Sequence, residues 1–316
     1  MQFYKHLFLK LQANQKVYLL TVIENSGSSP GRKGFKMLVA EDGFIFGSIG
    51  GGVMEFSLVE STKKLLEEGD LKIFFKKQVH RGDRENGSGM ICSGEQTVVF
   101  HPLNMKNIQM VEGIKNALEG NKKGTLILTP TSIQFSEEKI EEKFEIKITS
   151  GKHWIYKEQI GFKNTLYLVG GGHVSVAVSA LFVTLGFYVV VFDDRENLNT
   201  LEQNTSAHQK LIVDYQKISN YISEGKQNYV AIMTNRYIDD KLILSKLIHK
   251  KLAYLGVLGS TAKLKAMWEV LEREGITKSQ LDRVHGPIGV SIKSQTPHEI
   301  AVSIAAEVIR VKNVDQ

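Results

Sequence analysis

The feature that most constrains this fold is a series of short apolar segments that alternate with helical patterns from Thr165 onward. Strands are expected at TLYLVG, FYVVVFDD, KLIVD, YVAIMT and AYLGVLG, and helices at 173–185, 238–249 and 261–274. Such alternation is typical of a parallel sheet, because a crossover must return the chain to the start of the next strand. The pattern predicts an α/β fold in which residues 164–316 form a Rossmann-like, doubly wound parallel sheet.

A glycine-rich turn follows the first of these strands. Gly170, Gly171 and Gly172 come directly after the strand and precede a helix that begins near His173. Residues without a Cβ allow a diphosphate to approach backbone N–H groups at a helix N-terminus. Ser175 stands where the dinucleotide fingerprint has Gly or Ala, so the match is incomplete. Either this turn binds a nucleotide, with His173 donating to a phosphate or capping the turn, or the glycines only bring the helix close to the sheet.

An acidic pair ends the next strand. Asp193 lies 193 − 172 = 21 residues after Gly172, where it is placed to accept from ribose hydroxyls. Asp194 follows it directly. Arg195 would favour a ribose 2′-phosphate, whereas the two carboxylates repel one, so NAD and NADP both stay open.

The N-terminal part has a different pattern. An apolar strand from Val17 is followed by the loop ENSGSSPGRKGFK, a hairpin around Asp42-Gly43, three glycines and an amphipathic helix over 53–68. Strands KIFFK and TVVFHPL flank a polar loop. These segments predict a smaller, mixed α+β domain in residues 1–103, and residues 104–163 are expected to connect the two domains and to include some strands. At the other end, Thr296, Pro297 and Glu299 predict the start of a last helix that runs to about 310.

Composition argues against several classes of function. A net charge of +6 on 316 residues, with no Lys/Arg block interleaved with aromatics, disfavours nucleic-acid binding. The single cysteine, Cys92, excludes an internal disulfide and a Cys-only metal site. No secretory signal and no apolar run of ~18–20 residues is found, so we expect no membrane insertion and a cytoplasmic location.

Several motifs, taken in order, resemble the XdhC/CoxI family of accessory proteins for xanthine dehydrogenase and related molybdenum hydroxylases. SSPGRKGFKMLVAEDG and GSIGGGVMEF are similar to its N-terminal domain, and GGGHV, VFDDR, YLGVLGS and PIGVSI…TPHEIAVSIAAEVI to its C-terminal Rossmann domain. The resemblance implies a chaperone that binds the molybdenum cofactor (molybdopterin) and protects it while a cysteine desulfurase installs the terminal sulfur. The chaperone then passes the cofactor to an apo molybdenum hydroxylase of the xanthine dehydrogenase type. A homodimer is expected.

Under this resemblance, we expect the cofactor to bind in the N-terminal domain. Such a ligand needs N–H donors for its phosphate and a protected pocket for its pterin. Two loops are expected to supply these donors, although ordinary turn chemistry is the alternative for each: Ser26-Gly27-Ser28 and Gly50-Gly51-Gly52.

Cys92 is the candidate ligand to the molybdenum of the cofactor or contact to its sulfido group, because thiolates are soft ligands and a loop flanked by Gly and Ser can expose one. The alternative is a small buried apolar side chain. Relatives frequently carry a second cysteine after the helix-start glycines. Here that position is Val53, so one protomer cannot form a two-thiolate site.

Two more turns of the C-terminal domain resemble family motifs. Where many relatives have two histidines, this chain has Asn235 and Tyr237, which removes both imidazoles but keeps Thr234 and Asp240 to cap a helix or touch a ligand. The other turn provides a hydroxyl and an ammonium suited to an anion, or simply a capped helix with a solvated lysine. Its residues are Gly259, Ser260 and Lys263.

These observations favour an accessory protein over a catalyst, since a carrier needs no catalytic triad and none is found. The alternative is an NAD(P)-dependent oxidoreductase that uses the C-terminal Rossmann domain, although no Tyr-x-x-x-Lys pair stands out. A third interpretation is a scaffold whose nucleotide site has lapsed. Whether NAD(P) or another nucleotide binds in addition to the molybdenum cofactor stays open.

Overall fold

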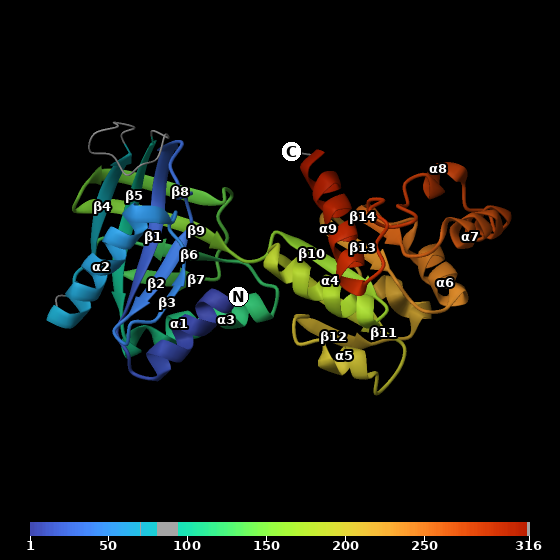
Figure 1. The fold of residues 1–316 in the computed structure, drawn as a ribbon, viewed down its shortest axis with the longest axis horizontal. Coiled ribbons are helices and arrows are strands. Elements are labelled where there is room, and N and C mark those ends of the chain that lie inside the picture. The colour runs from blue at the N-terminus through green and yellow to red at the C-terminus, as the bar shows by residue number, and fades with distance from the viewer. Residues whose placement is uncertain (70, 81–93, 315–316) are drawn as a thin grey trace. The chain divides into compact units, whose positions relative to one another are not determined.

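The chain folds into two compact units, Met1–Gly161 and Phe162–Gln316, and the computed structural model describes residues 1–69, 71–80 and 94–314 (Figure 1). The strands of the first unit pair antiparallel. The strands of the second unit pair parallel. The α/β class and the parallel C-terminal sheet predicted from strand–helix alternation are therefore confirmed.

The first sheet of unit 1 has the order β3-β2-β1-β5-β4. Its strands are β1 (Val17–Gly27), β2 (Lys36–Ala40), β3 (Ile45–Gly47), β4 (Phe74–His80) and β5 (Gly94–Leu103). The central strand β1 is buried continuously over residues 17–23, which explains its uninterrupted apolar sequence. Helix α2 (Gly52–Glu68) covers one face, with Leu58 and Leu66 packed in one core with Tyr18 and Val98.

A second sheet of unit 1, with the order β7-β6-β9-β8, forms from the segment after residue 103. Its strands are β6 (Gly124–Leu128), β7 (Ile133–Ser136), β8 (Phe144–Ser150) and β9 (His153–Ile160). A largely buried ion pair between Lys36 and Glu158 (2.5 Å) joins β2 to β9. Helices α1 (Gln2–Gln12) and α3 (Ile108–Glu119) and the 3-10 turn η1 (Met105–Asn107) complete the unit.

The sheet of unit 2 has the order β12-β11-β10-β13-β14. Its strands are β10 (Asn164–Val169), β11 (Phe187–Asp193), β12 (Gln209–Ile212), β13 (Gly225–Ile232) and β14 (Leu252–Val257). From β10 the chain passes to β11 on one side and later to β13 on the other. The strand order therefore reverses at β10, and in open parallel sheets ligands bind beyond the carboxyl ends of the strands at such a point.

Helices cover both faces of the unit 2 sheet. On one face α4 (His173–Thr184) and α9 (Pro297–Val314) lie side by side, with Val178, Phe182 and Ile304 in a shared core (Figure 1). On the other face lie α6 (Tyr237–Leu247), α7 (Thr261–Arg273) and the 3-10 turn η2 (Tyr215–Asn220). The short helices α5 (Asn199–Gln203) and α8 (Lys278–Leu281) complete the unit. Within the described residues, no helix is both long and apolar enough to cross a bilayer.

Helix α9 begins where the sequence predicts it. Glu299 N donates to Thr296 Oγ1 (3.2 Å), and Thr296 N donates to Glu299 Oε2 (3.0 Å), so the predicted capping box is formed.

Candidate functional site

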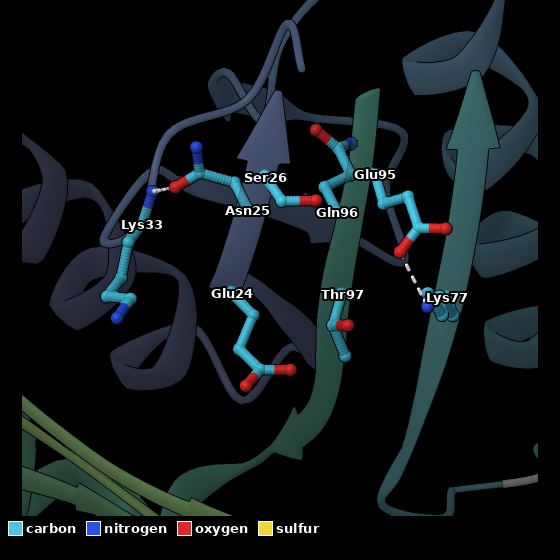
Figure 2. Close-up of a pocket in the computed structure, with 8 residues that line it drawn as sticks. All are labelled: Glu24, Asn25, Ser26, Lys33, Lys77, Glu95, Gln96 and Thr97. Carbon is cyan, nitrogen blue, oxygen red and sulfur yellow. Dashed lines mark hydrogen bonds and ion pairs between the residues drawn. The ribbon is translucent and has the colours of Figure 1, made fainter. Parts of the chain in front are cut away.

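A polar cavity of ≈ 300 Å³ lies where β1, β4 and β5 run side by side in unit 1 (Figure 2). It is lined by Glu24, Asn25, Ser26, Lys33, Lys77, Glu95, Gln96 and Thr97. Of the expected loop Ser26-Gly27-Ser28, the first two residues end β1, and only Ser26 lines the cavity. Cys92 lies outside the described residues.

Gln96 links the loops around this cavity. Its carboxamide oxygen accepts from Gly31 N (2.9 Å) and Ser29 Oγ (3.1 Å), and its nitrogen donates to Ile49 O (3.3 Å) and Gln78 Oε1 (2.8 Å). The side chain is buried and all four of its hydrogen-bonding positions are used. One amide therefore joins the loop after β1, the turn before α2 and strand β4, which brings together the two loops singled out from the sequence.

Glycine is required where these loops meet. A Cβ on Gly50, whose φ is +133°, would lie 2.7 Å from Gly31 N, and a Cβ on Gly31 would lie 2.4 Å from Ile49 O. Neither distance is possible for a real side chain. The glycines therefore permit close packing of backbone on backbone at the edge of the cavity.

The amides of the Gly50-Gly51-Gly52 turn have internal partners. Gly51 N and Ile49 N both donate to Glu55 Oε2 (2.9 and 2.8 Å), and Gly50 N donates to Ser48 Oγ (3.1 Å). Glu55 thus neutralises the N-terminus of α2 from within the chain. The N–H groups of Gly50 and Gly51 are engaged in this structure, and anion binding by the turn stays a prediction.

The cavity carries two cations and two carboxylates. Lys77 pairs with Glu95 (2.6 Å), whereas the ammonium of Lys33 makes no ion pair within the part of the chain that the structure describes. The backbone N–H of Lys33 donates to Asn25 Oδ1 (2.9 Å), which fixes the loop. Figure 2 shows Lys33 and Lys77 on opposite sides of the cavity, with Asn25, Ser26 and Gln96 between them. The cavity therefore offers a mixture of donors, acceptors and an ammonium that no described carboxylate neutralises.

In unit 2 the glycine turn closes tightly over the sheet. A Cβ on Gly170, whose φ is +115°, would lie 2.4 Å from Met233 O, so only glycine fits there. A Cβ on Gly172, in contrast, would meet no atom within 4 Å. Gly172 precedes the exposed His173 at the start of α4, whose first amides have no partner within the helix. This end of the turn is open to a ligand.

Asp193 is buried and fully engaged. Its Oδ2 accepts from Gly171 N (2.7 Å) and Arg195 Nη2 (2.9 Å), and its Oδ1 accepts from Arg195 N (3.0 Å) and Nε (2.8 Å). Burial alone would raise the pKa of Asp193, but the donors from Arg195 and Gly171 outweigh it and hold the pKa below its usual value. Its predicted contact with a ribose stays a prediction.

The structure brings together Thr234, Asp240 and Lys263, which the sequence analysis took from two separate motifs. Asp240 Oδ1 accepts from Thr234 N (3.0 Å) and Oγ1 (2.6 Å), and its Oδ2 accepts from Lys263 Nζ (2.6 Å). Asp240 is fully buried. Ser260, which follows Gly259, caps α7 by accepting from Lys263 N (3.2 Å). These contacts tie the ends of β13 and β14 to α6 and α7.

Sequence reasoning did not identify Arg236. Its guanidinium contacts Asp239 through Nε (2.5 Å) and Nη2 (3.0 Å) and reaches Asp194 across the sheet edge (3.0 Å). The spacing of Arg236 and Asp239 at a helix start is a local signal for that pair. Among the described residues, no group of three or more His, Cys, Asp and Glu side chains is arranged to hold a metal ion.

Comparison with known proteins finds two family models that match parts of this chain. The family model described as "XdhC Rossmann domain" matches residues 166–308, and the one described as "XdhC and CoxI family" matches residues 10–74. A crystal structure described as a xanthine dehydrogenase from Bacillus halodurans superposes with a TM-score of 0.73 at 24% identity, covering 99% of this chain and 96% of that one. At this identity the superposition supports the fold.

Three curated relatives are similar over most of this chain. An uncharacterized protein, YqeB of Escherichia coli, is 27% identical over 92% of this chain, which spans 43% of that relative's length. A protein of Bacillus subtilis described as a probable xanthine dehydrogenase component is 22% identical, covering 98% of this chain and 97% of the relative. The molybdenum cofactor insertion chaperone PaoD of E. coli is 20% identical, covering 96% and 85%.

Proposed function

The chain belongs to the XdhC and CoxI family, and from this premise we propose that it binds the molybdenum cofactor and delivers it to an apo molybdenum hydroxylase of the xanthine dehydrogenase type. The similarity to a molybdenum cofactor insertion chaperone over 96% of the chain supports this function. While the cofactor is bound, the chain protects it as a cysteine desulfurase supplies the terminal sulfur. The transfer requires direct contact with both proteins, and a homodimer is part of this proposal.

The observation that carries the proposal is the polar cavity beside Gln96. A molybdopterin ligand combines a phosphate with a flat ring that has both donors and acceptors. The ammonium of Lys33 suits the phosphate, and the carboxylate of Glu24 with the amide of Asn25 suits ring N–H groups. The side chains of the cavity therefore fit an anionic, polar ligand of this kind.

Cys92 completes the proposed site as the contact to molybdenum. The strand β5 begins at Gly94, two residues after Cys92, and its residues Glu95, Gln96 and Thr97 line the cavity. This short chain distance supports placing the thiol near the same ligand. A thiolate is a soft ligand that suits the metal head of the cofactor.

The proposed role of unit 2 is to bind a nucleotide at the glycine turn. The open space at Gly172 and the amides at the start of α4, which lack partners within the helix, support a phosphate there. Lys263 and Ser260 lie at the same carboxyl edge of the sheet, and Asp240 holds the Lys263 ammonium. A nucleotide bound at this edge would affect the rest of the unit through the contacts at the ends of β13 and β14.

Cofactor delivery can be tested with purified apo-hydroxylase, free molybdenum cofactor and the full-length chain under anaerobic conditions. We expect the chain to increase the fraction of hydroxylase that becomes active. Lys33→Ala should reduce cofactor retention by about tenfold, as expected for the loss of a charged hydrogen bond. Lys147→Ala, an exposed change on β8 outside the cavity, is the matched control. No gain over cofactor alone would argue against delivery.

A further inference from the structure

Unit 2 contains a second cavity, of ≈ 480 Å³, beyond the carboxyl ends of β11, β12 and β13. Its lining comes from the residues that follow β11, the end of β12 and the start of η2, and the start of α6. These residues are Asp194, Ile212, Val213, Asp214, Tyr215, Arg236, Asp239 and Leu242. The volume lies in the usual range for small-molecule pockets, and the position is the carboxyl edge where parallel sheets bind ligands.

The cavity combines apolar walls with acidic groups. Ile212, Val213, Tyr215 and Leu242 supply aliphatic and aromatic surface, and Ile212 is 47% exposed although it ends a strand. Such a surface suits a flat, uncharged ring. A ligand that covers an exposed isoleucine at a concave site gains from removing its apolar surface from water.

Asp214 provides a hydrogen-bond acceptor at this cavity. Its Oδ1 accepts from Gln216 N (2.9 Å) and so caps η2, and its carboxylate makes no other hydrogen bond within the described part of the chain. Its side chain is exposed. The second oxygen is therefore available to accept from a ligand amine, and fixing one oxygen in the cap holds the other in place.

The charged side chains that line the cavity disfavour the binding of a phosphate there. Arg236 is the cation of the cavity lining, and both Asp194 and Asp239 already bond its guanidinium. Asp214 adds a third carboxylate. A phosphate placed here would face three carboxylates and compete with two of them for the one guanidinium.

We propose that this cavity binds the base of an adenine nucleotide whose ribose carries no 2′-phosphate, with the exocyclic amine donating to Asp214. Adenine presents an amine on a flat ring, whereas hypoxanthine presents a carbonyl that would oppose the carboxylate. Asp194, which lines the cavity, directly follows Asp193 in the chain. The carboxylate of Asp193 accepts a hydrogen bond from the N–H of Gly171. A nucleotide can therefore place its phosphate at the turn and its base here. The inference rests on the proposed nucleotide role of the glycine turn.

The test is isothermal titration calorimetry of the full chain with NAD, NADP and nicotinamide hypoxanthine dinucleotide, in which a carbonyl and a ring N1–H replace the amine and the unprotonated N1 of adenine. We expect NAD to bind at least about tenfold more tightly than either analogue. Asp214→Asn keeps an oxygen for the η2 cap and turns an NH₂ toward the ligand. This variant should reverse the preference, so that the hypoxanthine analogue binds more tightly than NAD.

Two further variants control for folding and location. Asp282→Asn makes the same chemical change at an exposed site directly after α8 and should leave the preference unaltered. Ile212→Trp fills the cavity from an exposed position and should weaken NAD binding by about tenfold or more. Thermal unfolding of each variant shows whether the fold is retained.

The outcomes separate this inference from the proposals on which it rests. NAD affinity that is unchanged in Asp214→Asn and Ile212→Trp would overturn the base site and leave nucleotide binding at the turn in place. AMP and CMP are titrated in the same way, and tighter binding of CMP than of AMP would overturn the assignment of adenine. Binding of none of these nucleotides would overturn the base site and the nucleotide role together, and would leave cofactor carriage to be decided by its own assay.

Discussion

The backbone N–H of Gly171 donates to the buried carboxylate of Asp193 at 2.7 Å. In the sequence these residues looked like two separate contacts to a dinucleotide, one for the diphosphate and one for the ribose. In the structure they bond each other, and Arg195 covers the remaining acceptor positions of the carboxylate. Asp193 thus holds the glycine turn in place, while the open end of the turn lies at Gly172.

The substitution Asp193→Asn should destabilise unit 2. Asparagine retains one acceptor oxygen and turns an NH₂ group toward donors from Arg195 or Gly171, which leaves donors to this buried side chain unpaired. We expect the free energy of unfolding to fall by about 2 kcal/mol in urea titrations. Asp282→Asn, at an exposed position, is the control and should change it by less than about 0.5 kcal/mol.

Asp193→Asn also distinguishes two roles for this carboxylate. If Asp193 acts only by keeping unit 2 folded, NAD affinity should recover when the variant is measured well below its unfolding temperature. If it positions the turn or bonds the ribose, affinity stays weak while the fold is intact. Calorimetric titration at two temperatures separates these results.

Gln96→Glu should disturb the N-terminal cavity more than its small change of shape suggests. Glutamate has no N–H to donate to Ile49 O and Gln78 Oε1, and it places a charge in a buried site. We expect a loss of about 2–4 kcal/mol in unfolding free energy at neutral pH. The exposed change Gln134→Glu on β7 controls for the added charge. An unfolding midpoint equal to that of Gln134→Glu would contradict the role assigned to Gln96.

Acidic pH should lower the free energy of unfolding of unit 2, because Glu307 becomes protonated. Burial tends to raise the pKa of Glu307, but hydrogen bonds from His285, Tyr254 and Gly289 N outweigh it and lower the pKa from 4.5 to about 2. A carboxylate with a lowered native pKa stabilises the fold above its unfolded pKa, and this contribution is lost as pH falls from 4.5 to about 2. The loss amounts to about 3 kcal/mol.

Urea midpoints measured from about pH 6 down to about pH 3 test this dependence. Glu307→Gln should be less stable than the wild type at the upper end and should lose less stability on acidification. Glu272→Gln, at an exposed position on α7, should keep the wild-type slope. Parallel slopes for wild type and Glu307→Gln would show that another group controls acid stability.

Cys92→Ser should weaken retention of the molybdenum cofactor and leave the far-UV circular dichroism unchanged, since oxygen is a harder ligand than thiolate. The neighbouring change Ser93→Ala is the control, because it alters the same segment without touching the thiol. Molybdenum content after gel filtration measures the difference. Equal content in wild type and Cys92→Ser would remove Cys92 from the proposed site.

Local patterns were enough to predict much of unit 2. The helix expected over 173–185 is observed as His173–Thr184, and that expected over 261–274 as Thr261–Arg273. These elements are set by periodicity, glycines and capping residues that lie within a few positions of one another. The capping box of Thr296 and Glu299 is recognisable for the same reason.

The arrangement of the candidate sites depends on distant pairs and could not be predicted in this way. Gln96 bonds Ser29, which lies 67 residues away, and Arg236 bonds Asp194, which lies 42 residues away. No local pattern marks Gln96 as buried, because a single glutamine in an apolar strand can face either side of the sheet. Nor does sequence spacing show that Asp193 turns toward Gly171.

Anaerobic purification of the full-length chain from a molybdenum-replete host tests the central claim most directly. Bound pterin is measured by fluorescence after oxidation, and molybdenum is measured by metal analysis on the same sample. The account predicts that both approach the molar amount of the chain, and that they fall together in Lys33→Ala but not in Lys147→Ala. Absence of pterin and molybdenum, even after free cofactor is added, would contradict it.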